Sequence, residues 1–119
     1  MEQRWKEWRR AMVFNPPEVV LSGSQPFSPG FFVTVPSVPG IYVITDLRGP
    51  LYVGKTSNLH VRVDQHFNDT HNRSLREAMR RPMWKLWFHW IEMEEAKIHS
   101  YEPKLIEALK PLCNATFVS

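Results

Sequence analysis

Two short apolar segments separated by a turn give the clearest pattern in the chain. The stretches "IYVIT" (41–45) and "LYVG" (51–54) are rich in β-branched and aromatic residues, and "DLRGP" between them has the composition of a turn. They predict an antiparallel hairpin. Apolar residues then recur every fourth position, at Leu59, Val63 and Phe67, which predicts a helix over about 58–67 with Ser57 as its N-cap.

The segments that follow the hairpin and its helix predict three more elements. A short helix is expected over 73–81, ended by Pro82. The stretch "WKLWFHWI" (84–91) predicts a third strand, because alternate residues are large and apolar. They would share one face of that strand: Trp84, Leu86, Phe88 and Trp90. A last helix is expected over 94–109, where Pro103 should kink or restart it.

The amino-terminal third has a different composition. Residues 3–13 carry Trp5, Trp8 and Met12 at helical spacing, so a short helix is predicted there. Prolines and glycines then interrupt 14–39, which excludes a long helix and favours an extended segment that wraps the domain, with one short strand at 31–35.

Together these elements predict an α+β fold with a small central antiparallel three-stranded sheet flanked by helices. A length of 119 residues suits a single domain. We expect residues 1–36 to form an extension, made of the N-terminal helix and the Pro-rich segment, and residues 37–119 to form the domain itself.

Composition and charge limit the partners and the cellular compartment that the sequence predicts. The formal net charge of +3 gives a mild preference for anionic partners, and the single Cys113 excludes an intrachain disulfide. No apolar run approaches the ~20 residues of a membrane span, and the charged amino terminus does not read as a signal peptide. These features predict a soluble cytoplasmic protein with no membrane partner.

Five polar side chains lie at positions that could form one cluster. Strand alternation and the short turn allow Tyr42 and Tyr52 onto one side of the sheet. On the next helix Asn58, Arg62 and His66 recur every fourth residue, beside the apolar row. Ordinary strand packing of the tyrosines and a solvated polar flank of the helix are the alternative interpretations.

Glu102 lies on the apolar stripe of the last helix, four residues from both Ile98 and Ile106. Carboxylates are seldom buried without a partner, so two explanations stand side by side. One is a salt bridge to an arginine such as Arg62. The other is a divalent cation such as Mg²⁺, which takes one or two protein carboxylates and fills its other positions with water and phosphate oxygens.

Basic residues are concentrated between Lys55 and Lys85, where seven Lys or Arg stand against three Asp or Glu. Contacts with a phosphate backbone would explain this surplus, with Trp84 and Trp87 nearby for stacking on bases. A solvated helix face would explain it equally well.

Taken together, these segments resemble the GIY-YIG endonuclease family. "GIY" stands at 40–42, and "YVG" at 52–54 occupies the place of the second signature. "KTSNLHVRVDQHF" resembles the family's following helix, with Arg62 and His66 at its arginine and histidine positions. "EPKLIEALKPLCN" resembles the closing segment, which places Glu102 as metal ligand and Asn114 as the terminal asparagine. Five elements in the correct order make a specific match over roughly residues 37–116.

The resemblance implies hydrolysis of DNA phosphodiester bonds with one divalent metal, Mg²⁺ or Mn²⁺, held by Glu102. It implies a catalytic set of six residues: Tyr42, Tyr52, Lys55, Arg62, His66 and Glu102. Substrate contacts are expected from six others: Gly54, Asn58, Arg73, Arg76, Arg80 and Asn114. We assign proton transfer from the attacking water to Tyr42, whose pKa neighbouring cations must depress, with His66 as the rival base.

Two other classes of function remain open at this level. One is a catalytically silent nucleic-acid-binding module of the same fold, and the other is a protein-interaction domain suggested by the Trp-rich strand. The sequence does not distinguish single-stranded, double-stranded and branched DNA, nor a monomer from a homodimer. Repair, recombination, restriction and phage defence are all compatible contexts.

Overall fold

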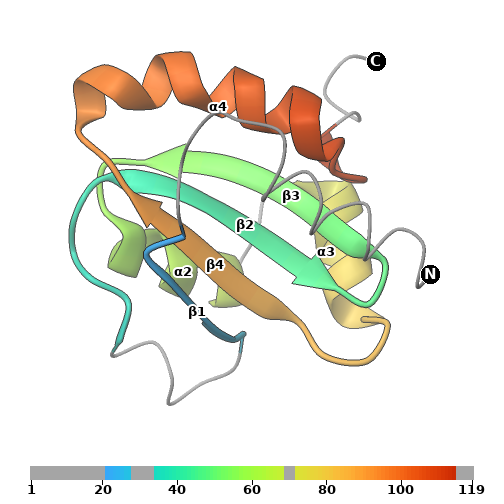
Figure 1. Ribbon diagram of the computed structural model, residues 1–119. Helices are drawn as coiled ribbons and strands as arrows, with labels where there is room; N and C mark the ends of the chain where they lie inside the picture. The colour runs from blue at the N-terminus through green and yellow to red at the C-terminus, as the bar shows by residue number, and fades with distance from the viewer. Residues whose placement is uncertain (1–20, 28–33, 69–71, 115–119) are drawn as a thin grey trace.

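The computed structural model describes residues 21–27, 34–68 and 72–114 of the chain. Within these ranges it contains four strands and three helices (Figure 1). In chain order they are β1 (Gly23–Pro26), β2 (Gly40–Asp46), β3 (Gly49–Thr56), α2 (Leu59–Asn68), α3 (Arg73–Arg80), β4 (Trp87–Glu92) and α4 (Glu95–Leu109). The helix predicted over 3–13 lies outside the described residues.

The strands form one antiparallel sheet in the order β1-β4-β2-β3. The predicted α+β class is confirmed, and the sheet has one strand more than the three expected. The additional strand is β1, "GSQP", whereas Thr34 and Val35 of the strand predicted at 31–35 are not in a strand and the rest of that segment is outside the described residues. A four-residue edge strand that ends in proline carries no apolar alternation, so the sequence pattern did not reveal it.

Helices cover both faces of the sheet, as Figure 1 shows for α4 on one side and for α2 and α3 on the other. Alternation along β2 divides its side chains between two apolar clusters. Tyr42 and Ile44 join the cluster that includes Leu59 and Val63 of α2, while Ile41 and Val43 join Ile98, Leu105 and Leu109 of α4. The central strand β2 is therefore buried along its whole length.

Local interactions fix where the helices begin and end. Asn58, rather than the predicted Ser57, caps α2, because its side chain accepts a hydrogen bond from Val61 N at 3.1 Å. Asn72 caps α3 in the same way, accepting from Leu75 N at 2.9 Å. Pro103 is predicted to kink or restart the last helix; α4 continues through it as one element, so it does not restart there, and the kink stays a prediction.

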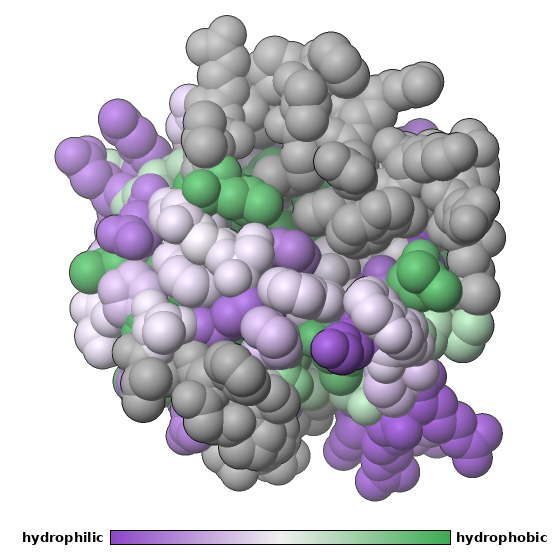
Figure 2. All heavy atoms as spheres, turned by 60° about the horizontal axis from the view of Figure 1, so that its bottom comes forward, coloured by the Kyte–Doolittle hydropathy of each residue, from purple (hydrophilic) through white to green (hydrophobic). Residues whose placement is uncertain are grey.

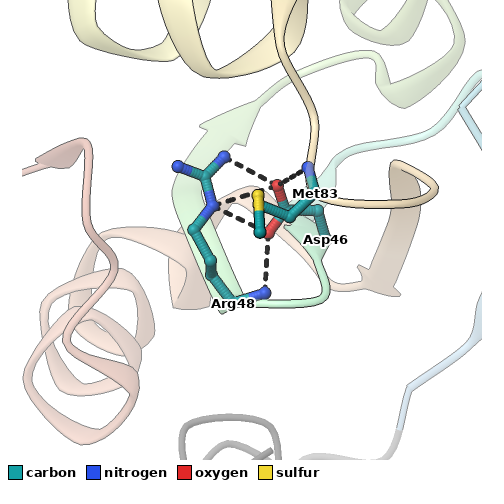
Figure 3. A network of polar contacts seen from close by, with 3 residues as sticks. All are labelled: Asp46, Arg48 and Met83. Carbon is teal, nitrogen blue, oxygen red and sulfur yellow. Dashed lines mark hydrogen bonds and ion pairs between the residues drawn. The ribbon is translucent and has the colours of Figure 1, made fainter. Parts of the chain in front are cut away.

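A buried carboxylate joins the β2–β3 turn to the segment before β4 (Figure 3). Arg48 donates to Asp46 from its backbone N at 2.8 Å and from its guanidinium at 2.7 Å. Met83 N donates to the same carboxylate at 2.9 Å, and Leu47 N donates to Met83 O at 3.0 Å. The Asp46 side chain is completely buried, so these bonds satisfy a charge that would otherwise be costly.

The segment before β4 departs from the sequence prediction. The third strand begins at Trp87 rather than Trp84, and only Phe88 and Trp90 of the predicted apolar face enter the core as strand residues. Trp84 has a φ of 75° and is 69% exposed. The tight turn held by Asp46 therefore takes Trp84 out of the strand.

Candidate active site

The pairing of β2 with β3 places both signature tyrosines on the same face of the sheet. Tyr42 lies opposite Gly54, and Ile44 lies opposite Tyr52. The two tyrosines are thus diagonal neighbours, and their ring centroids are 6.1 Å apart. The predicted common face is confirmed.

Gly54 explains how the Tyr42 phenol reaches across the sheet. A Cβ at this position would lie 2.3 Å from the Tyr42 hydroxyl oxygen and 2.3 Å from its Cζ. Only glycine leaves room for the ring. The predicted substrate contact of Gly54 stays a prediction, and its structural role is to admit this side chain.

We expect Gly54→Ala to disable the site while leaving the domain folded. The methyl group must displace the phenol of Tyr42, and such overpacking typically costs about 1–3 kcal/mol of folding free energy. Nuclease assays should show loss of cleavage, and urea denaturation should show a cooperative but less stable protein. Wild-type cleavage by Gly54→Ala would show that the position of the Tyr42 ring is unimportant.

Helix α2 brings an imidazole and a guanidinium to the same phenol. The Tyr42 hydroxyl and His66 Nε2 are 2.6 Å apart, and His66 is 8% exposed. Its ring also lies against both tyrosines, 5.2 Å from Tyr42 and 5.7 Å from Tyr52 between centroids. Arg62, one turn earlier on α2, lies close enough to the Tyr42 phenol to act against the rise of its pKa. The predicted helical row of Arg62 and His66 therefore meets the tyrosines.

Burial decides the protonation state of Tyr42. Its side chain is completely buried, and this desolvation raises its pKa well above the usual range, with a further rise from neighbouring Tyr52. Arg62 opposes the rise by its charge and hydrogen bond but does not cancel it. The prediction that neighbouring cations depress this pKa is wrong, because the loss of hydration outweighs one guanidinium.

Tyr52 has a more open position. It is only partly buried, and burial followed by the charge of Glu102 raises its pKa. Arg62 and a hydrogen bond from Tyr42 act in the opposite direction, by stabilising the Tyr52 phenolate. Of the two phenols, Tyr52 is thus the one that both meets solvent and has a hydrogen-bond donor for its ionised form.

Glu102 approaches the tyrosines from α4, around the exposed edge of β3. Its side chain is 17% exposed, and its partner is Lys55, with Nζ 3.7 Å from Oε1, rather than the arginine considered from the sequence. The Lys55 ammonium also lies 3.0 Å from Nδ1 of His99. Because lysine only donates, His99 Nδ1 accepts, and its proton is on Nε2.

His99 is a residue near the site that the sequence interpretation missed. It precedes Glu102 by three residues on α4, so the two lie on one helical face. This three-residue spacing from Glu102 is the feature of the sequence that could have indicated His99.

The side chains around Glu102 fit a single hard cation. Among the residues described, no three His, Cys, Asp or Glu side chains gather into a metal-binding group. One carboxylate at a polar, half-open edge matches the way Mg²⁺ is bound, with water and phosphate oxygens completing its shell. Glu102 is accordingly the residue available for that role.

The predicted substrate contacts fall into two groups. Asn58 caps α2, and Asn114 pairs with the backbone of Val53, accepting from its N and donating to its O, both at 2.8 Å. Those amides have structural partners, and their substrate roles stay predictions. The second group consists of exposed arginines on α3: Arg73, Arg76 and Arg80. Strongly hydrophilic side chains gather at the lower right of the surface in Figure 2.

None of the helices in the described part of the chain is both long and apolar enough to cross a membrane.

The fold and this cluster have counterparts among known proteins. The GIY-YIG catalytic domain matches residues 38–115. Structures of the N-terminal GIY-YIG endonuclease domain of UvrC from Thermotoga maritima share the fold. The form bound to magnesium, described as its catalytic divalent cation, is 22% identical, with 68% of this chain and 88% of that chain covered and a TM-score of 0.54.

An asparagine-to-alanine mutant of the same domain, bound to its catalytic divalent cation, matches with 22% identity, coverage of 68% and 87%, and a TM-score of 0.54. The present protein has the α+β fold of these domains, and its matched segment is a GIY-YIG catalytic domain. The chain belongs to the GIY-YIG family.

Proposed function

We propose that this protein is a divalent-metal-dependent endonuclease that hydrolyses DNA phosphodiester bonds, with residues 37–119 as its nuclease domain. The observation that carries the proposal is that two groups of polar side chains meet at one edge of the sheet. The phenol–imidazole–guanidinium cluster from β2, β3 and α2 lies beside Glu102 and Lys55. Acid–base groups, cations and a carboxylate are what phosphodiester hydrolysis requires.

Glu102 is the residue that would hold Mg²⁺ or Mn²⁺. When bound, the cation supplies Lewis-acid stabilisation of charge on the phosphate and on the leaving oxygen. The Lys55 ammonium now lies 3.7 Å from this carboxylate, and the lysine side chain is 43% exposed. When the cation takes its place, the lysine can turn toward a phosphate.

Arg62 supplies fixed positive charge on the other side of β3. Its guanidinium lies close enough to both phenols to favour their ionised forms. A planar guanidinium also binds phosphate oxygens through two parallel hydrogen bonds. We assign it to stabilise the charge that grows on the phosphate during attack.

We assign the acceptance of the proton from water to Tyr52, and we assign Tyr42 and His66 to support it. Tyr42 is fully buried, whereas Tyr52 is partly open to solvent, and Arg62 and the Tyr42 hydroxyl both act to lower the pKa of Tyr52. His66 then lies 2.6 Å from Tyr42 and completes the chain of polar groups. In this arrangement Tyr42 and His66 are positioning residues that stabilise the Tyr52 phenolate, and Tyr52 touches the reacting water.

Contacts with the DNA backbone are assigned to the exposed arginines of α3, Arg73, Arg76 and Arg80. Arg80 lies 3.6 Å from Glu77, but both side chains are more than half exposed, so this ion pair does not prevent phosphate binding.

The direct test of this function is the chemistry of the products. We expect the protein to cut labelled DNA in Mg²⁺ and to leave 5′-phosphate and 3′-hydroxyl ends, which a ligase rejoins and a polymerase extends. Single-stranded, fully paired and branched DNA, together with RNA of the same sequence, should be compared as substrates. DNA binding without cleavage of any of them would instead identify a catalytically silent binding module.

A further inference from the structure

A cavity of about 390 Å³ lies away from the catalytic cluster, beside β4 and the β2–β3 turn. Its volume falls within the ~300–1,000 Å³ typical of small-molecule sites. The indoles of Trp84 and Trp87 line it together with Lys85, Leu47 and His89. Flat aromatic walls beside an ammonium are a combination that binds nucleobases and their phosphates.

The wall formed by Trp84 is held in place by the turn that precedes it. Met83 N donates to the Asp46 carboxylate (Figure 3). Met83 O accepts a hydrogen bond from Leu47 N. The next residue, Trp84, has a φ of 75°, a left-handed conformation that is strained in a residue other than glycine. The two hydrogen bonds therefore keep an unfavourable conformation that presents a large indole, 69% exposed, to solvent.

The lining formed by Trp87 and His89 carries no net charge at neutral pH. The Trp87 ring stacks on His89 with an interplanar angle of 18°. Ser24 Oγ and Thr45 Oγ1 contact the two ring nitrogens of His89 at 2.6 and 2.8 Å. Burial lowers the pKa of His89 to about 4, so the ring is neutral above that pH.

The charge at the cavity suits an anionic ligand. The Lys85 ammonium lies 5.5 Å from the centre of the Trp84 ring, at the rim. Asp46 also lines the cavity, but its carboxylate is neutralised by Arg48 at 2.7 Å. A phosphate next to a base in the cavity would therefore meet a cation without facing an uncompensated anion there.

The cavity lies on the face of the sheet that also carries Lys55 and α4, whereas the side chains of Tyr42 and Tyr52 lie on the opposite face. Trp87 and His89 pair with Thr45 and Val43, which puts them on the face of the sheet that α4 packs against, and α4 lies over β2 and β3 beside the cavity. Measured along the sheet, two strand spacings of ~4.8 Å and three residues of ~3.4 Å separate Trp87 on β4 from Gly54 on β3, which pairs with Tyr42 of β2, or roughly 14 Å. This distance corresponds to about four base pairs of B-form DNA.

We propose that this cavity binds an unpaired nucleobase of the DNA substrate, with Trp84 and Trp87 stacking on the base and Lys85 contacting its phosphate. The inference rests on the proposed function and adds the substrate class to it. The preferred substrate is DNA with an unpaired nucleotide a few base pairs from the cut, as at a bulge, a flap or a branch, rather than a fully paired duplex.

The test compares three DNAs that differ only at one position: a paired duplex, the same duplex with unpaired thymines, and one with abasic sites in their place. Binding is measured with the full chain carrying Glu102→Gln, so that the DNA is not cut. We expect the thymine DNA to bind tightest. Trp84→Ala should weaken it about tenfold, to the abasic level, because stacking on one base is lost.

Two further variants separate stacking from charge and from folding. Trp84→Phe keeps a flat ring and should retain most of the preference, while Lys85→Gln should weaken all unpaired DNAs, abasic included. The proposal is overturned if thymine and abasic DNA bind equally, or if Trp84→Ala weakens all three DNAs alike. It is also overturned if Trp84→Ala dissociates a dimer in sedimentation while DNA binding is unchanged, since the indole would then contact a second copy.

Cleavage of the paired duplex by the protein with Glu102 intact separates this inference from the proposed function. Wild type and Trp84→Ala should both cut it slowly in Mg²⁺. If neither cuts any DNA, the proposed function fails, and the binding comparison still decides whether the cavity holds a base.

Discussion

Glu102→Gln is expected to lower the rate of DNA cleavage in Mg²⁺ by about 10³-fold, because it removes the carboxylate available to the cation. A cation bound against the phosphate contributes several kcal/mol of transition-state stabilisation, and ~1.4 kcal/mol corresponds to a factor of ten. The fold should survive, since the glutamine keeps the shape of the side chain. Among the described residues the change removes one ion pair, with Lys55, whose side chain is 43% exposed.

A matched control lies on the same helix. Glu107 is exposed on α4, so Glu107→Gln changes the net charge equally and should leave cleavage within a few-fold of wild type. Single-turnover rates at saturating protein measure the effect free of binding, and urea denaturation measures the fold. An equal loss of cleavage rate in both variants would show that the effect comes from the change in overall charge. Cleavage by Glu102→Gln at the wild-type rate would remove Glu102 from the site.

Tyr52→Phe is the second change with a large expected effect. If Tyr52 accepts the proton from the attacking water, losing its hydroxyl should reduce the single-turnover rate by about 10²–10⁴-fold. Tyr42→Phe and His66→Ala should each reduce it less, because they remove only the support for the phenolate. DNA affinity should change little in Tyr52→Phe, whose ring still packs against His66 and Tyr42.

The pH dependence of the rate distinguishes a phenol from an imidazole as the base. Burial and Glu102 raise the pKa of Tyr52 above its usual value of 10, so its ionised fraction increases with pH across the neutral and alkaline range. The wild-type rate should therefore rise from pH 6 to 9 without a plateau, and Tyr52→Phe should flatten this dependence. An imidazole base of unperturbed pKa ~6.5 would instead give a plateau above about pH 7.5.

Local patterns in the sequence predicted the elements that build the site. The hairpin, the helix with Arg62 and His66, and the α+β class are all present, because strand alternation and helical spacing are local properties. The common face of Tyr42 and Tyr52 followed from the same alternation. The bulge between Ile44 and Thr45 sets the exact register and had no sequence signal.

Properties that depend on packing between distant segments could not be predicted in the same way. The burial of Tyr42, which raises its pKa, arises from α2, β4 and the missing side chain of Gly54 together. The partner of Glu102 is Lys55, because α4 approaches the edge of β3 from the face opposite to α2. Trp84 left the predicted strand because Asp46, distant in sequence, binds Met83 N.

The central claim is that DNA is cut at the edge of β3 by metal-dependent hydrolysis. Its most direct measurement is one time course of end-labelled DNA with the wild-type protein, in Mg²⁺, in EDTA, and in EDTA followed by an excess of Mg²⁺. We expect cleavage in Mg²⁺, none in EDTA, and full recovery when Mg²⁺ is restored. Cleavage at the same rate in EDTA as in Mg²⁺ would contradict the claim.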